Sequence, residues 1–573
     1  TNMFGLFYCL GYGSDTFNLD INSLDMSRAT NMSYMFGYVG YESTTFSLNV
    51  DVLETGNNAS MSYMFYYAGY TSTTFSLDLS VFNTSKVINT SYMFYYSGYS
   101  ATSINYIGVG NFDVSNVTNM THMFNRVGYN ASNFNFDLSS WDTGNVTDMS
   151  HMFNRSGYNS ATYSLVGLDN WNMSNVVNAN GMFYSAAQKA PTFDLGDLSK
   201  WDVSSLQVPE SLFAYSGKNA TTWNVGNLSG WDTSSFTVMT SMFNSAGYAD
   251  TSWSVGDLSN WDTSNVKNMY YCFYYSGYSS SDWNVGDLSN WQTGNVTNMS
   301  YMFNYAGYNA TSWYAGDLSK WDVSKVTNMK YMFAYAGYTT TSWSVGNLSG
   351  WVTSSATDMS YMFNYAGYNS SSFIFDMSKW NVSNVTTCAT MFSFAGYKAQ
   401  TWSVGDLSEW KTTSLQIANH MFDYAGAYST SFNLGNIGSW DVSKVTVMNS
   451  MFGGSGYSSV VDYYIGDLSG WDTSSVTNMN YMFWNTAHGA KEFNIGNLNG
   501  WNTSNVKSMN LMFYRTGYSA EIFNIGSLSG WDVSQITSMS QMFQEAGYNA
   551  SEFNLGDLSN WNVSKVTDMT KMF

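Results

Sequence analysis

The chain has 573 residues, and its 40 acidic against 20 basic residues give a formal net charge of −20. Because such a charge repels phosphate backbones, we expect no nucleic acid among its partners. Apolar residues make up 44 % of the chain, yet no run of about 18 apolar residues occurs, so we expect nothing that spans a membrane.

One repeat of 30 residues occupies nearly the whole chain. It reads Gly-Asx-Leu-Ser-x-Trp-Asp-x-Ser, then Val-x-x-Met-x-x-Met-Phe, then Ala-Gly-Tyr and a short stretch ending in Trp or Phe. A fixed period of 20–50 residues is typical of solenoids and propellers. We therefore predict an all-β or β-rich repeat solenoid of about nineteen stacked coils, each of 30 residues, with short strands and single helical turns.

The register of the repeat can be followed through one slot. It begins with the apolar residues Leu24, Leu53, Phe82 and Phe112. It continues, with one step of 29 and one of 31 residues, through Trp141, Trp171, Trp201, Trp231, Trp261, Trp291, Trp321, Trp351, Trp380, Trp410, Trp440, Trp471, Trp501, Trp531 and Trp561. Residues that recur at one slot stack into ladders, and the apolar slots are expected to point inward.

The repeat predicts a single solenoid over residues 1–573. The chain starts at Thr1 and stops at Phe573, both within the Met segment of a repeat, so we expect a piece truncated mid-repeat at both ends, because solenoids normally carry polar caps. The pattern breaks at 186–213, where Pro191 and Pro209 occur. Since proline cannot donate a ladder hydrogen bond, we predict a bend there.

The repeat at residues 286–315 illustrates the expected local structure. Polar and apolar residues alternate from Thr311 to Ala315, which predicts a strand. We expect a second short strand from Val296 to Met299. The segment from Met299 to Tyr305 fits either extended chain or a single helical turn, because short apolar runs do not separate the two.

Glycine and Asx residues mark the corners of each coil. The glycine before the tyrosine is expected to supply a positive φ, as at Gly247, Gly307, Gly337 and Gly367. Two Asx slots suit turns in which the side chain binds corner backbone groups. Their members include Asp257, Asp287, Asp317, Asn347 and Asp406, and after the tryptophan Asp232, Asp262 and Asp322.

Two slots carry tyrosine on what we expect to be an outward surface. One precedes the second Met and the other lies two residues after the Phe. Tyrosine beside Ser, Asn and Gly is a composition used by binding surfaces, and flat aromatic rows could stack against sugar faces. The alternative is that stacked tyrosines only stabilise their own ladder. The candidate binding ladder is Tyr271, Tyr301, Tyr331, Tyr361, Tyr275, Tyr305, Tyr335 and Tyr365.

The other polar residues indicate no metal, cofactor or catalytic site. His122 and His151 occupy the same tyrosine slot in consecutive repeats, but two imidazoles without further ligands make a poor zinc site. The Asp slot after the tryptophan also holds Lys411 and Val352, which a calcium ligand position would not accept. No nucleophile–base pair recurs, so we expect no enzyme and no cofactor.

Three cysteines are too few for a disulfide framework. Cys272 and Cys388 stand in Met slots, where we expect them to act as small apolar core residues. Cys9 stands in a slot that is usually tyrosine.

The run from Leu288 to Trp291, with Asn295 to Phe303, resembles the repeat of BspA-like leucine-rich-repeat surface proteins. The same wording, Trp-Asp-x-Ser-x-Val-x-x-Met-x-x-Met-Phe, occurs in mycoplasma-type lipoproteins and recurs in nearly every repeat here. The resemblance implies an LRR-like solenoid, an extracellular or cell-surface location, and adhesion to host or matrix components. This repeat departs from the usual one by continuing through Ala-Gly-Tyr and an aromatic strand.

We therefore expect an extracellular repeat rod that serves adhesion or surface display, with a glycan or a matrix or surface protein as its partner. The alternative is a structural subunit of a self-assembling filament, sheath or surface layer, whose partners are copies of itself. A third hypothesis is ice or crystal-surface binding by rows such as Thr311-Ser312 and Thr341-Ser342, which Asp250 and Asp282 interrupt.

Overall fold

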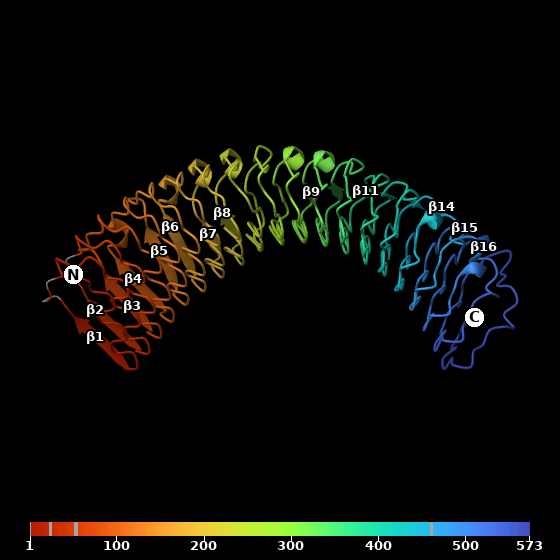
Figure 1. The fold of residues 1–573 in the computed structure, drawn as a ribbon, viewed down its shortest axis with the longest axis horizontal. Helices are drawn as coiled ribbons and strands as arrows, with labels where there is room; N and C mark the ends of the chain where they lie inside the picture. The colour runs from red at the N-terminus through yellow and green to blue at the C-terminus, as the bar shows by residue number, and fades with distance from the viewer. Residues whose placement is uncertain (1, 22–23, 25, 51–54, 459–461) are drawn as a thin grey trace. The chain divides into compact units, whose positions relative to one another are not determined.

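The computed structural model of the chain describes residues 2–21, 24, 26–50, 55–458 and 462–573. It comprises two compact units, Thr1–Gly286 and Asp287–Phe573. Within each unit every repeat forms one coil, and successive coils lie side by side (Figure 1). The predicted β-rich repeat solenoid is confirmed, and Leu53 of the predicted register lies outside the described residues.

Unit 1 contains eight of the named strands and four 3-10 turns among its described residues. The strands are β1 (Thr16–Asp20), β2 (Thr45–Asn49), β3 (Thr74–Asp78), β4 (Ser103–Ile107), β5 (Asn133–Asp137), β6 (Thr162–Val166), β7 (Thr192–Asp194) and β8 (Thr222–Asn224). The 3-10 turns are η1 (Val109–Asn111), η2 (Leu168–Asn170), η3 (Leu198–Lys200) and η4 (Leu228–Gly230). Strands β1 to β4 form one parallel sheet, and β5 with β6 and β7 with β8 form parallel pairs.

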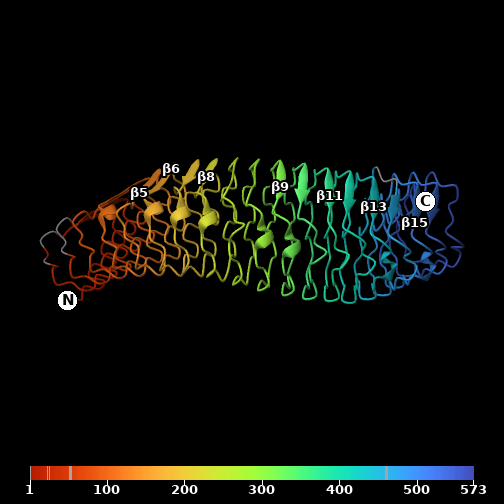
Figure 2. The ribbon, with the colours of Figure 1, turned by 90° about the horizontal axis from the view of Figure 1, so that it is seen from above.

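Unit 2 repeats this pattern with shorter strands. Its strands are β9 (Ser312–Tyr314), β10 (Ser342–Ser344), β11 (Ser372–Ile374), β12 (Thr401–Ser403), β13 (Ser431–Asn433), β14 (Asp462–Tyr464), β15 (Glu492–Asn494) and β16 (Ile522–Asn524). Its 3-10 turns are η5 (Leu288–Asn290), η6 (Leu318–Lys320), η7 (Ile437–Ser439) and η8 (Leu498–Gly500). Within the unit, β9, β11, β13 and β15 lie along one edge (Figure 2).

The strand predicted from Thr311 to Ala315 is present as β9. Trp313 is buried between exposed Ser312 and Tyr314, the alternation that makes a half-buried strand. Its parallel partner β10 aligns Trp343 with Trp313, so equal slots face each other across the coils.

Aromatic ladders fill the inside of each coil. In unit 2 the rings of Phe303 and Phe333 stack with centroids 5.6 Å apart, and those of Trp321 and Trp351 with centroids 6.5 Å apart. The Trp321 indole N–H donates to the carbonyl of Leu288 at 2.8 Å, one coil back. Because a buried indole donor needs a partner, this bond lets a large ring occupy the core without an unsatisfied polar group.

The segment from Met299 to Tyr305 is neither extended nor helical. The Met302 N–H donates to the carbonyl of Met299 at 3.2 Å and the Ala306 N–H to that of Phe303 at 2.9 Å, which closes successive β-turns. Between them, the N–H groups of Tyr301 and Tyr305 donate to the next coil at 2.8 and 2.9 Å. The segment is therefore a run of turns in which backbone N–H groups donate alternately to a carbonyl of the same coil and to a carbonyl of the next coil.

Other local expectations need correction. The short strand predicted from Val296 to Met299 is reduced to one isolated parallel bridge between Asn298 and Asn328. The single helical turns occur as 3-10 turns before the tryptophan, as in η5, where the preceding Asp287 caps the turn. Leu24 occupies the inward slot but is 41 % exposed, whereas Phe82 and Phe112 are buried.

The corners follow the predicted chemistry. Gly337 has φ of 55° and Gly307 has φ of 53°, the left-handed region that glycine adopts freely. Asx side chains accept backbone N–H bonds two residues on, as from Ser289 to Asp287 at 2.9 Å and from Ser324 to Asp322 at 2.9 Å. The Asp ladders are therefore corner caps.

The segment 186–213 keeps the inter-coil bonding of its neighbours. The N–H of Gly181 donates to the backbone carbonyl of Glu210 at 2.8 Å, and the rings of Phe183 and Phe213 stack with centroids 5.9 Å apart. Pro191 and Pro209 have no N–H to contribute to these ladders. The predicted bend at this segment stays a prediction.

Candidate functional site

Three tyrosine ladders run along unit 2, and two of them are the predicted ones. The first ladder is Tyr301, Tyr331 and Tyr361, the second is Tyr305, Tyr335 and Tyr365, and the third is Tyr308, Tyr338 and Tyr368. Ring centroids within these ladders are 4.2 to 4.7 Å apart and the rings are nearly parallel. All nine side chains are half-buried.

The third ladder was not predicted as part of the site. Its tyrosines follow the corner glycine, and from the sequence the repeated Ala-Gly-Tyr indicates only a turn. In the fold, Tyr305 lies beside Tyr308 with ring centroids 5.8 Å apart, and Tyr365 lies beside Tyr368 at 5.7 Å. The second and third ladders therefore form one aromatic surface two columns wide.

The tyrosines of the first two ladders have an unusual backbone conformation. Tyr335 has φ of 58° and Tyr331 has φ of 56°, the left-handed region that side chains with a Cβ seldom adopt. This conformation costs about 1–2 kcal/mol per residue, whereas an aromatic stack contributes about 0.5–1.5 kcal/mol beyond the area it buries. A tyrosine inside a ladder has a stacking neighbour on each side, so the stacks offset the backbone strain.

The phenols of Tyr331, Tyr335 and Tyr365 stay protonated at neutral pH. Burial, with smaller contributions from neighbouring phenols, raises the pKa of Tyr331 and of Tyr335, and raises the pKa of Tyr365 to about 12. Each hydroxyl is therefore both a hydrogen-bond donor and an acceptor.

The stacking decides which part of each ring can meet a partner. Because both faces of Tyr335 are covered by Tyr305 and Tyr365, the ring faces are not available to stack on a sugar. The ring edges remain, repeated once per coil, and the hydroxyl of Tyr335 is within hydrogen-bonding reach of that of Tyr305. The surface is thus a row of rigid edges with hydrogen-bonding tips.

In unit 1 the tyrosines gather into a wider cluster. Tyr34 stacks on Tyr63 with centroids 4.3 Å apart, and Tyr67 stacks on Tyr96 at 4.5 Å. Tyr66 fills the space between these columns in edge contact with Tyr67 at 4.7 Å. The remaining candidates, Tyr271 and Tyr275, also belong to unit 1, where each contacts Tyr274.

His122 and His151 are stacked, as their shared slot predicts, with ring centroids 4.6 Å apart. Burial lowers the pKa of His122 to about 4 and also lowers that of His151, against the opposing charge of Asp148. Both rings are neutral at pH 7. Among the described residues, no group of three His, Cys, Asp or Glu side chains is placed to hold a metal ion.

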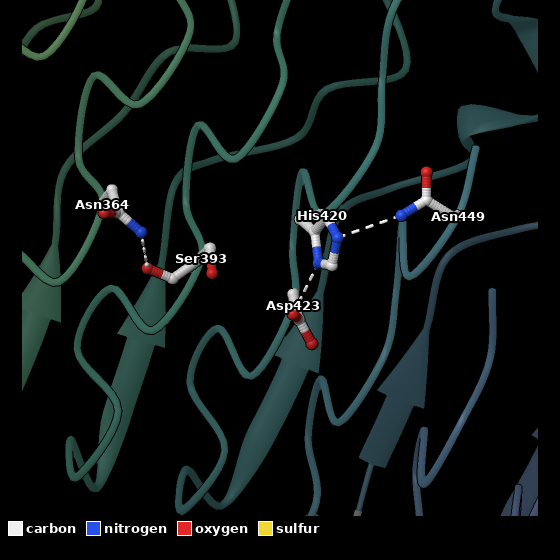
Figure 3. Close-up of polar contacts among 5 residues, drawn as sticks. All are labelled: Asn364, Ser393, His420, Asp423 and Asn449. Atoms are coloured by element: carbon white, nitrogen blue, oxygen red, sulfur yellow. Dashed lines mark hydrogen bonds and ion pairs between the residues drawn. The ribbon is translucent and has the colours of Figure 1, made fainter. Parts of the chain in front are cut away.

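His420 occupies the first-ladder slot further along unit 2 and forms a polar network (Figure 3). Its Nδ1 lies 2.9 Å from Asp423 Oδ2, and its Nε2 lies 3.0 Å from Asn449 Nδ2. Since the Asn449 amide donates to Nε2, the imidazole proton resides on Nδ1 and is donated to the carboxylate. Nearby, Asn364 donates to the backbone carbonyl of Ser393 at 3.0 Å.

This network couples two coils but presents no nucleophile. Burial raises the pKa of the Asp423 carboxyl, although the hydrogen bond from His420 acts in the opposite direction. The imidazole nitrogen that would activate a hydroxyl is already bonded to Asn449. The arrangement therefore positions the two coils and is not arranged for acyl transfer.

Two of the three cysteines are core residues, as predicted from their Met slots. Cys272 and Cys388 are buried, and burial raises the pKa of the Cys272 thiol and raises that of Cys388 to about 12. Cys9 is exposed. Over the ranges that the structure describes, no helix is long and apolar enough to cross a membrane.

These features define a repeat solenoid protein with stacked tyrosines on its surface. Overlapping matches to one family, described as "Mycoplasma protein of unknown function, DUF285", begin with residues 1–103 and 71–188, end with 427–547 and 487–573, and cover the chain. The chain belongs to this family. The match supports the predicted repeat kinship with mycoplasma proteins, while membership of the BspA-like family stays a prediction.

Other comparisons add little. A search of curated proteins returned no match. One solved structure, titled "Crystal structure of TLR13-ssRNA13 complex", is similar to 79 % of this chain at 10 % identity. This chain spans 64 % of that one, and the TM-score of 0.15 is too low to support a shared fold.

Proposed function

We propose that this chain is a non-enzymatic, extracellular or cell-surface repeat protein that serves adhesion or surface display. The observation that carries the proposal is the double column formed by the second and third ladders of unit 2, with rings 4.3 to 4.7 Å apart along each ladder. The resemblance of the chain to BspA-like surface proteins supports the proposed location. Membership of a family of repeat proteins is compatible with that location.

Rigidity makes these columns suited to binding. A side chain that is immobile before binding loses little conformational entropy when a partner arrives, and ordering a free side chain costs about 0.5–1.5 kcal/mol. Tyr335 is held between Tyr305 and Tyr365 in the free protein, so this cost is met on folding. Tyrosine is also the residue that binding surfaces use most for rigid contact with a polar tip.

The chemistry of the surface indicates the class of partner. Its tips are hydroxyls, and exposed Asn309 lies next to the third ladder. The surface therefore offers mainly hydrogen bonds, with the ammonium group of Lys398 6.0 Å from the centroid of Tyr368. Glycans and the polar faces of matrix or surface proteins have matching groups. Binding through neutral groups is expected to change little with ionic strength.

The test is a binding array of immobilised glycans and matrix proteins, probed with the folded chain. We expect hits whose signal survives high salt. A chain whose near-ultraviolet circular dichroism reports ordered aromatic rings, but which binds nothing on either array, contradicts the proposal. Fibres in negative stain, with no array binding, would instead favour the self-assembling filament.

A further inference from the structure

Cationic and hydrogen-bond-donating side chains line a hollow in unit 1, although the chain as a whole is acidic. The volume of the hollow is about 370 Å³, and Arg126, Arg155, His122 and His151 line it together with Asn125 and tyrosines. The chain has a net charge of −20, yet two arginines of consecutive coils meet here. Arg126 and Arg155 both occupy the slot that holds tyrosine in the second ladder.

The two guanidinium groups lack counter-charges. In the described part of unit 1, neither lies within salt-bridge distance of a carboxylate. Arg515 occupies the same slot in unit 2 and shows the alternative, because Glu545 on the next coil pairs with it at 2.8 Å. Like charges on neighbouring strands destabilise each other, so the pair in unit 1 is better satisfied by an anion from outside.

The aromatic rings hold the guanidinium groups in place. The Arg126 guanidinium carbon lies 4.6 Å from the centroid of Tyr96, and that of Arg155 lies 5.7 Å from the centroid of Tyr184. Cation–π contact fixes an arginine without neutralising its charge. The N–H groups of both side chains are therefore positioned to donate, and one from Arg126 is bonded to the Tyr95 hydroxyl.

A second observation points to a ligand with hydroxyl groups. Asn125 is 4 % exposed and lines the hollow, and its Oδ1 has no hydrogen-bond partner. Its Nδ2 donates to Nδ1 of His122 at 2.7 Å, so the imidazole proton resides on Nε2 as a further donor. The Asn125 Oδ1 atom itself has less than 1 Å² of exposed surface, so it meets a ligand only after the amide turns toward the hollow; a sugar hydroxyl can then donate to it, whereas sulfate has no hydrogen to donate.

The acidic groups near the hollow are engaged elsewhere. Asp148 accepts from the N–H of Ser150 at 2.8 Å and from Asn178 at 3.2 Å. Burial raises the pKa of Glu210, which favours its neutral form. Neither carboxyl group lies within salt-bridge distance of Arg126 or Arg155, although the charge of Asp148 acts on His122 and His151.

We propose that this hollow binds an acidic saccharide, with its carboxylate or sulfate on Arg126 and Arg155 and a hydroxyl on Asn125. The arginines supply the charge-assisted bonds that planar anions prefer, and the tyrosines supply a surface for the sugar ring. This site deepens the proposed adhesive function, on which the choice of a saccharide rests, and it uses residues distinct from the ladders of unit 2.

The experiment is calorimetric titration of the full chain with 3′-sialyllactose, a glucuronic-acid disaccharide and a sulfated disaccharide, with lactose and sodium sulfate as comparisons. We expect at least one acidic saccharide to bind ten-fold or more tightly than lactose and sodium sulfate, and more weakly as salt is raised. The double variant Arg126→Gln with Arg155→Gln should lose this preference, and Arg515→Gln, which breaks a paired arginine in the same slot, should keep it.

Three results would overturn the inference. They are no binding of any acidic saccharide, equal binding of sodium sulfate, or unchanged binding by a folded double variant. The ladders are tested separately, because Tyr305→Phe, Tyr335→Phe and Tyr365→Phe leave the hollow intact. Loss of array binding in that triple variant with saccharide binding retained separates the two proposals, and so does the reverse.

Discussion

Substitution of Tyr335 tests the ladder structure directly. The Gly variant should be more stable than the Ala variant, which is the reverse of the usual order. The backbone of Tyr335 is left-handed, with φ of 58°, and its ring stacks on Tyr305 at 4.3 Å and on Tyr365 at 4.7 Å. Both substitutions remove the ring and its two stacks. Only the Gly variant also relieves the strain of the left-handed backbone.

The magnitudes follow from these contacts. Loss of two stacks and of half-buried ring area should destabilise the Ala variant by about 2–4 kcal/mol. The Gly variant recovers about 1–2 kcal/mol of left-handed strain but loses about 0.5–1 kcal/mol to the freedom of the unfolded chain. Tyr335→Gly should therefore be more stable than Tyr335→Ala by up to about 1.5 kcal/mol. Tyr335→Phe should be nearly neutral, because Phe394 already stacks on Tyr365 in the same slot at 4.6 Å.

Native-state hydrogen exchange read by mass spectrometry is the assay, because a long repeat array need not unfold in one step. Peptides that cover residues 330–340 report the local opening free energy of each variant. An Ala variant more stable than the Gly variant would refute the left-handed ladder. A Phe variant as unstable as Ala would show that hydroxyl bonds, and not stacking, hold the column.

Two further predictions concern the corners and the buried histidines. Gly337→Ala would place a Cβ 2.5 Å from the Cβ of Trp313, on backbone with φ of 55°. It should therefore lower the free energy of unfolding by about 2 kcal/mol or more, as read from thermal melts. Gly470→Ala is the control and should be tolerated, because its Cβ would meet nothing closer than 3.9 Å. Burial lowers the pKa of His122 from 6.5 to about 4, so the unfolded chain binds the proton first and stability should be lost as the pH falls from 6.5 to 4. The loss should be on the order of 1–2 kcal/mol, allowing for the water-accessible part of the ring, and His122→Tyr should reduce it in denaturation curves at pH 7 and pH 4.5.

The 30-residue period predicted the solenoid, the inward slots and the corner caps because each depends on residue type alone. The same reasoning found the first two tyrosine ladders. It placed Cys272 in the core from its Met slot, where the structure buries it. Periodicity is strong evidence here because every coil repeats the same packing problem.

What the sequence did not predict depends on contacts between coils. The left-handed backbone at Tyr301 and Tyr305 could not be inferred, because tyrosine seldom adopts it and the strain is offset by rings one coil away. The carbonyl that accepts from Trp321 lies 33 residues earlier in the chain. The hollow in unit 1 does leave a signal in the sequence, since Arg126 and Arg155 replace tyrosine in consecutive repeats. A single substituted slot does not show that the two side chains line one hollow.

The most direct test of the binding surface is the affinity of the triple variant Tyr305→Phe, Tyr335→Phe and Tyr365→Phe for a partner identified on the arrays. The variant keeps the rings and their stacks and removes only three hydroxyl tips. Since each lost hydrogen bond costs about 0.5–1.5 kcal/mol, we predict affinity lower by about ten-fold or more. Thermal stability should fall only slightly, because the stacks remain and only the bond between the Tyr305 and Tyr335 hydroxyls is lost within the ladder. Unchanged affinity in this folded variant would contradict the account, because the ladder would then serve only its own stacking.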